Sequence, residues 1–180
     1  MTNREQHLVE LVDEAGLAVG RATVADAHRA PGRLHRAFSV VLVDPAGRLL
    51  LQRRAAVKTR FAGRWANSCC GHPAPGSPLA TAAAERVRDE LGVAVADLRE
   101  VGVHTYRAAD DATGLVECEY DHVLLGRVPA DLDAAPDPAE VSELRWIGPS
   151  ALHDSIASDP DAYAPWLPGV LALIPTEPSG

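Results

Sequence analysis

Five residues of the kinds that bind divalent transition metals are spread over the first two thirds of the chain. They are His28, His35, His72, Glu117 and Glu119. Imidazole nitrogens and carboxylate oxygens together suit an ion such as Zn²⁺ or Mn²⁺. Glu117 and Glu119 are two positions apart in a predicted strand, so their side chains share one face. No pair has the tight spacing of a helical metal motif, so the histidines could equally be surface or hydrogen-bonded core residues.

A second group of reactive side chains lies in the segment NSCCGHP, which holds Cys69, Cys70 and His72. A thiol near a positively polarised centre can lose its proton and act as a base or a nucleophile. The alternative role is that of a small buried apolar side chain. Only one of two adjacent residues is expected to point into a site, and Cys69 is the natural candidate for the buried role.

Basic residues gather in one part of a chain that is otherwise acidic. They are Arg53, Arg54, Lys58, Arg60, Arg64 and Arg86. Guanidinium and ammonium groups suit phosphate, although a charged loop exposed to solvent explains most of the set equally well. Arg86 and Glu90 lie one helical turn apart and could form a surface ion pair. Alternatively, Glu90 could hold Mg²⁺ against a diphosphate while Arg86 contacts a phosphate oxygen.

The elements that would position these residues are mostly strands. Residues 37–43 and 48–53 are joined by a Pro/Gly turn and predict a hairpin. Residues 58–76 contain several breakers and predict a long loop of the kind that carries function. Further strands are predicted over residues 7–12, 99–106, 116–128 and 141–147.

One good helix follows the long loop. Ser77 is its predicted N-cap and Pro78 its first residue. Its apolar stripe consists of Ala83, Val87 and Leu91, and Gly92 is expected to end it. With helices also predicted at the Pro-containing C-terminal end, the pattern favours a mixed sheet covered by helices.

The composition indicates a globular protein whose partners are not polyanions. The 180 residues, 47% of them apolar, allow one domain with a hydrophobic core. The formal charge of −8 gives no general attraction for nucleic acid or for an anionic membrane. No signal peptide or transmembrane stretch is evident. The three cysteines, an odd number with two adjacent, argue against a disulfide framework, so we expect a cytoplasmic protein.

Taken together, these residues resemble the type I isopentenyl-diphosphate isomerases, a branch of the Nudix superfamily. The segments that carry the resemblance are HRAPGRLHRAFS (28–39), RRAAVKTRFAGRWANSCCGHP (53–73), ERVRDELGV (85–93), YRAADDATGLVECEYD (106–121) and YAPWLP (163–168). The family implies an α/β (α+β) fold, a Nudix-like α/β/α sandwich with a mixed sheet. We expect one isomerase domain over residues 1–180, acting as a monomer, with its core at about 7–168 and a flexible C-terminal end.

The resemblance also implies the reaction, in which isopentenyl diphosphate becomes dimethylallyl diphosphate through a carbocation. Such a site needs an acid, a base and a π face that stabilises the cation without attacking it. By similarity, Glu119, aided by Tyr106, protonates the terminal alkene while Cys70 takes the neighbouring proton. Cys70 is chosen over Cys69 because it lies two residues before the site histidine. Trp166 matches the aromatic residue that faces the carbocation.

Two metal ions are implied as cofactors. One Mn²⁺ or Zn²⁺ (or Mg²⁺) would be held by His28, His35, His72, Glu117 and Glu119. A second ion, Mg²⁺ bridging the diphosphate, would use Glu90. Contacts to the diphosphate would come from Arg54, Lys58 and Arg86, so the expected partner is a small prenyl diphosphate.

The chain departs from the pattern of the Nudix hydrolases, G-x5-E-x7-R-E-U-x-E-E-x-G-U, where U is a bulky aliphatic residue. Counted from Gly71, Ser77 stands in place of the first Glu, Glu85 in place of Arg, and Arg86 in place of the next Glu. The lost carboxylates argue against the main alternative, a hydrolase of nucleoside diphosphate derivatives. A second alternative, a Nudix module that only binds a ligand, would need neither an acid nor a base.

A second departure concerns the diphosphate. Val24 stands where the isomerases commonly have a lysine near this group. The absence of that lysine predicts weaker binding of the diphosphate, unless another cation such as Arg21 or Arg33 takes its place.

Overall fold

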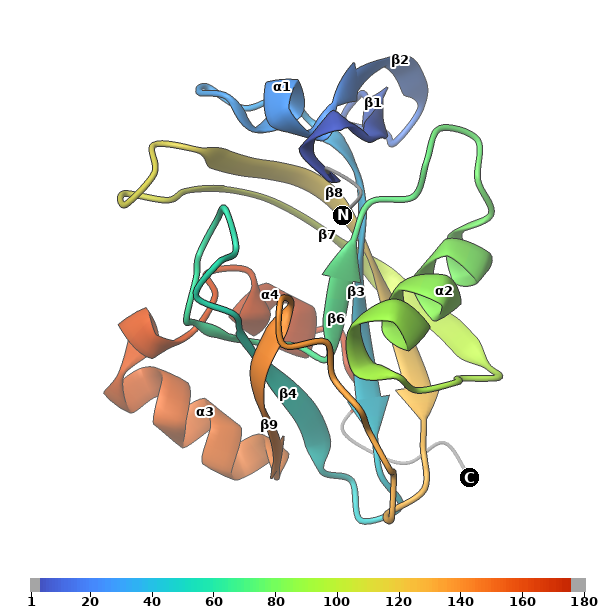
Figure 1. Ribbon diagram of the computed structural model, residues 1–180, viewed down its shortest axis with the longest axis vertical. Helices are drawn as coiled ribbons and strands as arrows, with labels where there is room; N and C mark the ends of the chain where they lie inside the picture. The colour runs from blue at the N-terminus through green and yellow to red at the C-terminus, as the bar shows by residue number, and fades with distance from the viewer. Residues whose placement is uncertain (1–3, 176–180) are drawn as a thin grey trace.

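The computed structural model describes residues 4–175, and it contains one mixed sheet of nine strands with helices on both faces (Figure 1). The elements in chain order are η1 (Arg4–Gln6), β1 (Leu8–Val12), β2 (Ala18–Thr23), α1 (Val24–His28), β3 (His35–Val43), β4 (Leu49–Arg54), β5 (Trp65–Ala66), β6 (Cys69–Gly71), α2 (Leu79–Leu91), β7 (Leu98–Ala109), β8 (Val116–Arg127), β9 (Val141–Ile147), α3 (Pro149–Ser158), η2 (Pro160–Ala162) and α4 (Leu167–Leu171). The predicted strands are therefore confirmed with small shifts at their ends, whereas β2 and α1 were not foreseen, and the short strands β5 and β6 lie within residues 58–76, where the sequence predicted a loop.

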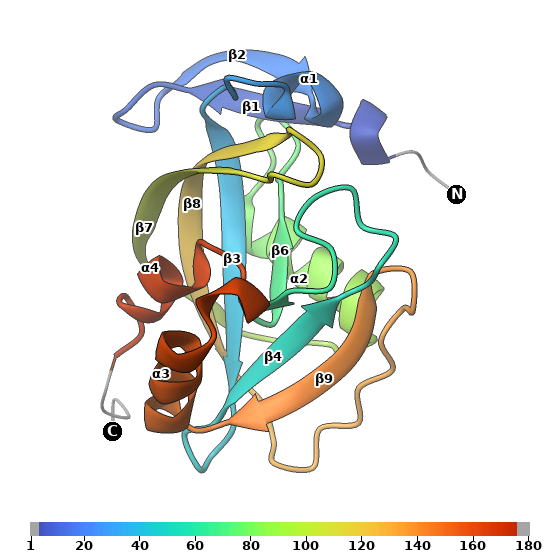
Figure 2. The same cartoon turned by 90° about the vertical axis from the view of Figure 1, so that its left-hand side faces the viewer.

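Strand β3 organises the sheet. It pairs in parallel with β8 along its whole length and antiparallel with β6. β7 completes a long hairpin with β8 on one side, and β4 with β9 lies on the other (Figure 2). The predicted hairpin between β3 and β4 is confirmed at its turn, where Val43 and Leu49 pair antiparallel, but the two strands do not pair beyond that point. β6 takes the edge of β3 that a longer hairpin would need, and β4 pairs instead with β9.

The two faces of the sheet bury two separate cores, which confirms the α/β/α sandwich. Strand side chains alternate between the faces, so Val40 and Leu42 pack with α2, whereas Val41 packs with α3 and α4. Figure 1 shows α2 on one side of the sheet and the two C-terminal helices on the other. Val170 and Leu171 are buried, so the core reaches past residue 168, where the sequence placed its end. Part of the expected flexible end, residues 176–180, lies outside the described residues.

The start of α2 differs from the prediction. Its N-cap is Pro78, without a side-chain cap, and Ser77 instead offers its carbonyl to Arg36 Nη1 at 3.2 Å. The predicted end is confirmed, because Gly92 adopts a left-handed conformation with φ of 68°. Among residues 4–175, no helix combines the length and the apolar character needed to span a membrane.

Candidate active site

Strand register brings the acidic residues of the site together. Glu117, Glu119 and Asp121 occupy alternate positions of β8, so all three side chains emerge from one face. His35 of β3 and Tyr106 of β7 lie directly opposite Glu119 on the two neighbouring strands. Strand register thus places His35 and Tyr106 next to Glu119, which sequence spacing alone does not reveal.

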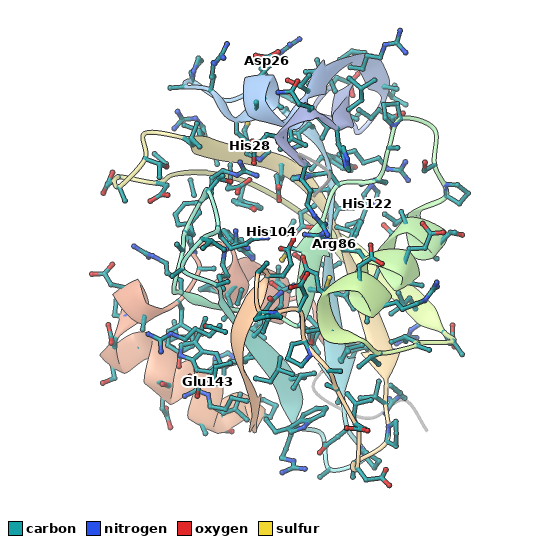
Figure 3. The ribbon with its side chains drawn as sticks, in the orientation of Figure 1. Asp26, His28, Arg86, His104, His122 and Glu143 are labelled. Carbon is teal, nitrogen blue, oxygen red and sulfur yellow. The ribbon has the colours of Figure 1, made fainter. Side chains whose placement is uncertain are left out.

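The predicted His/Glu set forms one cluster. His28, His35, His72, Glu117 and Glu119 each offer a ligand atom, and these atoms all lie within 4.8 Å of one another. His28 Nε2 is 2.7 Å from Glu117 Oε2, and His72 Nε2 is 2.8 Å from Glu119 Oε1. Figure 3 places His28 at the end of α1, while Asp26 of the same short helix lies at the outer surface. The unforeseen α1 is therefore the element that delivers His28.

Two hydrogen bonds orient the rings toward the centre of the cluster. His28 Nδ1 donates to the Val24 carbonyl and His35 Nδ1 to the Arg33 carbonyl, both at 2.7 Å. Such bonds fix the tautomer that leaves Nε2 free for a metal. His35 Nε2 is buried and has no hydrogen-bond partner among the described residues. Because an unpaired buried polar atom is costly, the cluster fits a bound cation.

The electrostatics of His35 and His72 agree with that role, whereas at His28 burial is outweighed by the hydrogen bond and charge of Glu117, which raise the pKa. Burial, aided by nearby histidines, lowers the pKa of His35 to about 4 and the pKa of His72 to about 3, so both rings are neutral donors at pH 7. Burial alone would raise the pKa of Glu117, but its hydrogen bond with His28 and the charges of His28 and Arg60 hold it well below the usual value. Arg60 Nε donates to Glu117 Oε1 at 3.0 Å.

Cys70 lies on the same face of the sheet, opposite Ser39 of β3. Its thiol is 3.3 Å from Asn67 Oδ1 and 3.7 Å from Ser39 Oγ. Burial, with the nearby charge of Asp121, raises the pKa of Cys70 to about 12. Burial and the charge of Asp121 therefore favour the protonated thiol over the thiolate.

Glu119 is a second titratable group, besides Cys70, that lines the cavity of the site. Tyr106 Oη donates to Glu119 Oε2 at 2.7 Å, as the predicted support of this residue requires. Burial and the charge of Glu117 raise the pKa of Glu119 to about 7. A carboxyl group with this pKa can carry a proton at neutral pH and can also release it.

Trp166 lies beside Tyr106 and Cys70. Its ring centroid is 6.0 Å from that of Tyr106, and Phe61 packs edge-on against it at 5.4 Å. Trp166 Nε1 donates to Asn67 Oδ1 at 3.0 Å, so one amide oxygen contacts both the indole and the Cys70 thiol. Asn67 is fixed in turn by its Nδ2, which donates to the carbonyls of Val40 and Cys69. The indole is thus held rigidly beside Cys70.

Many of these groups line one cavity of about 1080 Å³, whereas His28, His35 and Asn67 lie behind its lining. The predicted residues that line it are Cys70, His72, Tyr106, Glu117, Glu119, Trp166, Arg54, Lys58 and Arg86. Arg54, Lys58 and Arg86 thus form a cationic wall of this cavity. Lys58 pairs with Glu140, and Arg86 pairs with both Glu90 and Glu140. Arg86 points from α2 toward the centre of the molecule, and its buried Nη1 has no partner among the described residues (Figure 3).

Glu90 does not lie among the residues that line this cavity. It is buried behind Arg86 and accepts a hydrogen bond from Gln52 Nε2 at 3.3 Å and from the Cys69 thiol at 3.4 Å. The Arg86–Glu90 ion pair is therefore buried rather than a surface pair. A cation at Glu90 would have to replace at least one of these contacts.

Sequence reasoning missed three polar residues beside the predicted ones. Ser39 donates to Asp121 Oδ2 at 2.7 Å, which ties β3 to β8 next to Cys70. Asn67 lies within the NSCCGHP segment, but no spacing rule distinguishes it from a loop residue. Glu140 lies near Lys58 and Arg86 only because of the fold. Gly71, between Cys70 and His72, is needed because a Cβ there would lie 2.7 Å from the Phe38 ring.

Comparisons with known proteins place these features in context. The model of the NUDIX domain matches residues 33–168. An isopentenyl-diphosphate Delta-isomerase from Nocardia farcinica is 62% identical over 165 residues, covering 92% of this chain and 93% of that protein. Its namesake from Halorhodospira halophila is 45% identical, covering 89% of this chain and 90% of that one. The crystal structure of DR0079 from Deinococcus radiodurans has the same fold, with a TM-score of 0.75, 21% identity, and coverage of 94% and 100%.

Proposed function

This chain belongs to the NUDIX family and, within it, to the isopentenyl-diphosphate Delta-isomerases, and from that premise we propose how its residues perform the reaction. The enzyme isomerises isopentenyl diphosphate to dimethylallyl diphosphate, a step of isoprenoid precursor biosynthesis. One observation carries the proposal: an acidic group, a thiol and an indole face line the same cavity as a cationic cluster. Hydrolysis of a diphosphate would need neither the thiol nor the indole.

Proton transfer is assigned to Glu119 and Cys70. Glu119, hydrogen-bonded to Tyr106, gives its proton to the terminal alkene carbon. The tertiary carbocation that forms then loses a proton from the neighbouring carbon to the Cys70 thiolate. Burial keeps the Cys70 thiol protonated at neutral pH, so its proton must leave through the cavity before the thiolate, then a strong base, can act. Glu119, with a pKa of about 7, can carry the proton that the alkene receives. The reverse reaction uses the same two groups in opposite roles. After each turnover, proton exchange through the cavity restores the starting protonation states of Glu119 and Cys70.

Trp166 stabilises the carbocation between the two proton transfers. An indole face attracts a cation through its quadrupole and is a poor nucleophile. The hydrogen bond from its Nε1 to Asn67 keeps the ring from turning away. The ring also stands beside Arg54, whose Cζ is 5.4 Å from its centroid. The indole therefore adjoins both the acid/base pair and the cationic wall.

The diphosphate is assigned to the cationic wall, where Arg54, Lys58 and Arg86 supply charge-assisted hydrogen bonds. The unpaired Nη1 of Arg86 supports this assignment, because a buried donor without an acceptor calls for an anion. Glu90 would hold the Mg²⁺ that accompanies the diphosphate, once Arg86 transfers from Glu90 to a phosphate oxygen. This exchange explains why both residues are buried together in the protein without ligands.

The His/Glu cluster would hold one Mn²⁺, Zn²⁺ or Mg²⁺ through His28, His35, His72, Glu117 and Glu119. When bound, such an ion supplies positive charge that sets the protonation of its carboxylate ligands. The unpaired Nε2 of His35 supports this proposal. We also propose that the protein works in the reducing cytoplasm, because its proposed thiol base must stay reduced.

The decisive experiment is incubation with isopentenyl diphosphate and Mg²⁺, followed by separation of the products. Dimethylallyl diphosphate as the sole product is the expected result. Release of phosphate or pyrophosphate would instead indicate the hydrolase alternative. An unchanged substrate that nevertheless protects the protein against thermal unfolding would indicate a module that only binds.

A further inference from the structure

The N-terminal turn η1 closes one side of the proposed diphosphate cavity. Arg4 and Glu5 both line this cavity. Arg4 Nε is 3.1 Å from Glu140 Oε1, and Glu5 Oε1 accepts from Arg60 Nη1 at 3.1 Å and from Thr59 Oγ1 at 3.0 Å. In Figure 2, η1 is the deep-blue turn beside the N-terminal end, next to α1 and above the loop that follows β4. Two adjacent side chains of opposite charge thus fasten this turn over the cavity.

Glu5 connects the turn to the metal cluster. Arg60, which Glu5 holds through Nη1, donates through Nε to Glu117 Oε1 at 3.0 Å. Arg60 is 8% exposed, so these interactions are little weakened by water. A partly buried charge network, anchored by the buried Arg60 and Glu117, therefore sets the position of η1, and the position of Glu5 sets that of the adjacent Arg4.

Arg4 joins a group of cations from three separate parts of the chain. Arg4, Lys58 and Arg86 all contact the single carboxylate of Glu140. Arg54 and Arg60 also line the cavity, so among the described residues five cations share it with seven carboxylates, and the three cations around Glu140 form its most basic part. Three cations around one carboxylate leave this part of the cavity locally positive, which favours a bound anion.

Arg4 is suited to bind that anion rather than only to pair with Glu140. The ion pair uses Nε, so the two terminal nitrogens of the guanidinium remain for a second acceptor. The side chain is 42% exposed, as expected at the mouth of a cavity that must admit substrate. A guanidinium offers paired donors that match two phosphate oxygens.

Val24, the position at which the isomerases commonly have a lysine, lines the same cavity and brings no charge to it. Neither Arg21 nor Arg33, the cations that the sequence suggested as replacements there, is among the residues that line it. Arg21 instead lies exposed on β2, opposite Glu10. Arg4 is thus the basic residue that the fold itself adds to the cavity.

We propose that Arg4 is a substrate-binding residue that contacts the diphosphate, held in place by the Glu5–Arg60 pair. This proposal rests on the function proposed above. It also gives η1 a role in forming the wall of the cavity.

The test compares Arg4→Gln with Arg21→Gln, which removes the same charge from an exposed strand position. KM for isopentenyl diphosphate and kcat are measured at saturating Mg²⁺, and binding of inorganic pyrophosphate is measured by calorimetry. Arg4→Gln should raise KM about tenfold and weaken pyrophosphate similarly, with kcat within about twofold, because the diphosphate is bound equally in ground and transition states. Arg4→Lys should fall in between, and Arg21→Gln should leave KM unchanged.

Equal KM values and equal pyrophosphate affinities in Arg4→Gln and Arg21→Gln would overturn the proposal. So would a loss confined to kcat, since it would place Arg4 near the reacting carbons or in a purely structural role. Failure of the proposed function is a separate result: unaltered protein would leave isopentenyl diphosphate unchanged. Pyrophosphate calorimetry would still test whether Arg4 contacts a diphosphate in that case.

Discussion

The side chains of Cys69 and Cys70 project from opposite faces of the sheet. Cys69 Sγ is 3.4 Å from Glu90 Oε2 in the core beneath α2, whereas Cys70 Sγ is 3.3 Å from Asn67 Oδ1 beside Trp166. Because β6 pairs with β3, neither side chain can turn to the other face without breaking the strand. The two adjacent thiols therefore form a natural pair of variant and control.

Cys70→Ala should abolish isomerisation, whereas Cys69→Ala should keep most of it. Removing a positioned acid or base typically costs 10²–10⁴-fold in rate, and more where no water can substitute. Cys69→Ala removes only a small buried side chain, so its effect should be on stability. The measurement is kcat for dimethylallyl diphosphate formation, with urea unfolding of both variants. Equal losses of activity would mean that the wrong thiol, or the wrong mechanism, has been assigned.

Glu119→Gln should lower kcat by a similar 10²–10⁴-fold while KM changes little, because the amide cannot exchange a proton with the alkene. Tyr106→Phe should have a smaller effect, since Glu119 keeps its carboxyl group but loses the 2.7 Å hydrogen bond. Steady-state kinetics of both variants check this order. A Tyr106→Phe variant less active than Glu119→Gln would indicate that the phenol itself transfers the proton.

Metal binding can be tested on a single imidazole. His35→Ala should lower metal affinity by more than the roughly 10–100-fold that loss of an outer-shell partner costs. His122→Ala is the control, because His122 pairs with Glu100 away from the cluster. Elemental analysis of the purified proteins gives the readout. Full stoichiometric metal in a variant with alanine at His28, His35 and His72 would eliminate the proposed centre.

Strand alternation explains how much of the site could be predicted from sequence. It places Glu117 and Glu119 on one face and separates Cys69 from Cys70, and both relationships follow from the period of two. It does not give the register between strands, and register is what puts His35 and Tyr106 opposite Glu119. Those partners were identified only through the resemblance to a family.

Residues that matter through tertiary contact left no signal in the sequence. Glu140 precedes β9 in a segment without a motif, yet it binds Arg4, Lys58 and Arg86. The hairpin of β3 and β4 is shorter than predicted for a related reason. Local turn chemistry favoured pairing, but β6 competes for the same edge of β3 through contacts that are distant in sequence.

Asp110 predicts a pH dependence of stability. It accepts hydrogen bonds from Phe61 N at 3.1 Å and Thr113 Oγ1 at 2.9 Å, and so holds Phe61, at φ of 48°, against Trp166. Burial alone would raise the pKa of Asp110, but these bonds lower it below the usual value. Its stabilisation is therefore complete above the unfolded pKa near 4 and is lost as pH falls through the lower folded pKa.

Asp110→Asn should consequently reduce the free energy of unfolding at pH 6 by about 1–3 kcal/mol and should lose less further stability toward pH 3 than the unaltered protein does. Asp111→Asn, at the exposed neighbouring position, is the matched control and should follow the unaltered protein. Urea titrations at the two pH values provide the measurement. A parallel fall in Asp110→Asn would show that other carboxylates govern acid unfolding.

The last prediction concerns Val24, the first residue of α1, which lines the cavity while it also packs with Val9 and Ala27. A lysine there could keep its stem among these apolar neighbours and extend its ammonium group into the cavity. A new charge-assisted hydrogen bond contributes about 1.5–3 kcal/mol, less up to about 2 kcal/mol for ordering the long side chain. If Arg4 already supplies this charge, Val24→Lys alone should change KM little, whereas in Arg4→Gln it should restore much of the lost affinity with kcat unchanged.

Val24→Met separates charge from size, and thermal unfolding shows whether the packing around Val24 tolerates either change. An equal decrease of KM in both backgrounds would mean that the two cations act independently and that the place of the family's lysine was truly vacant.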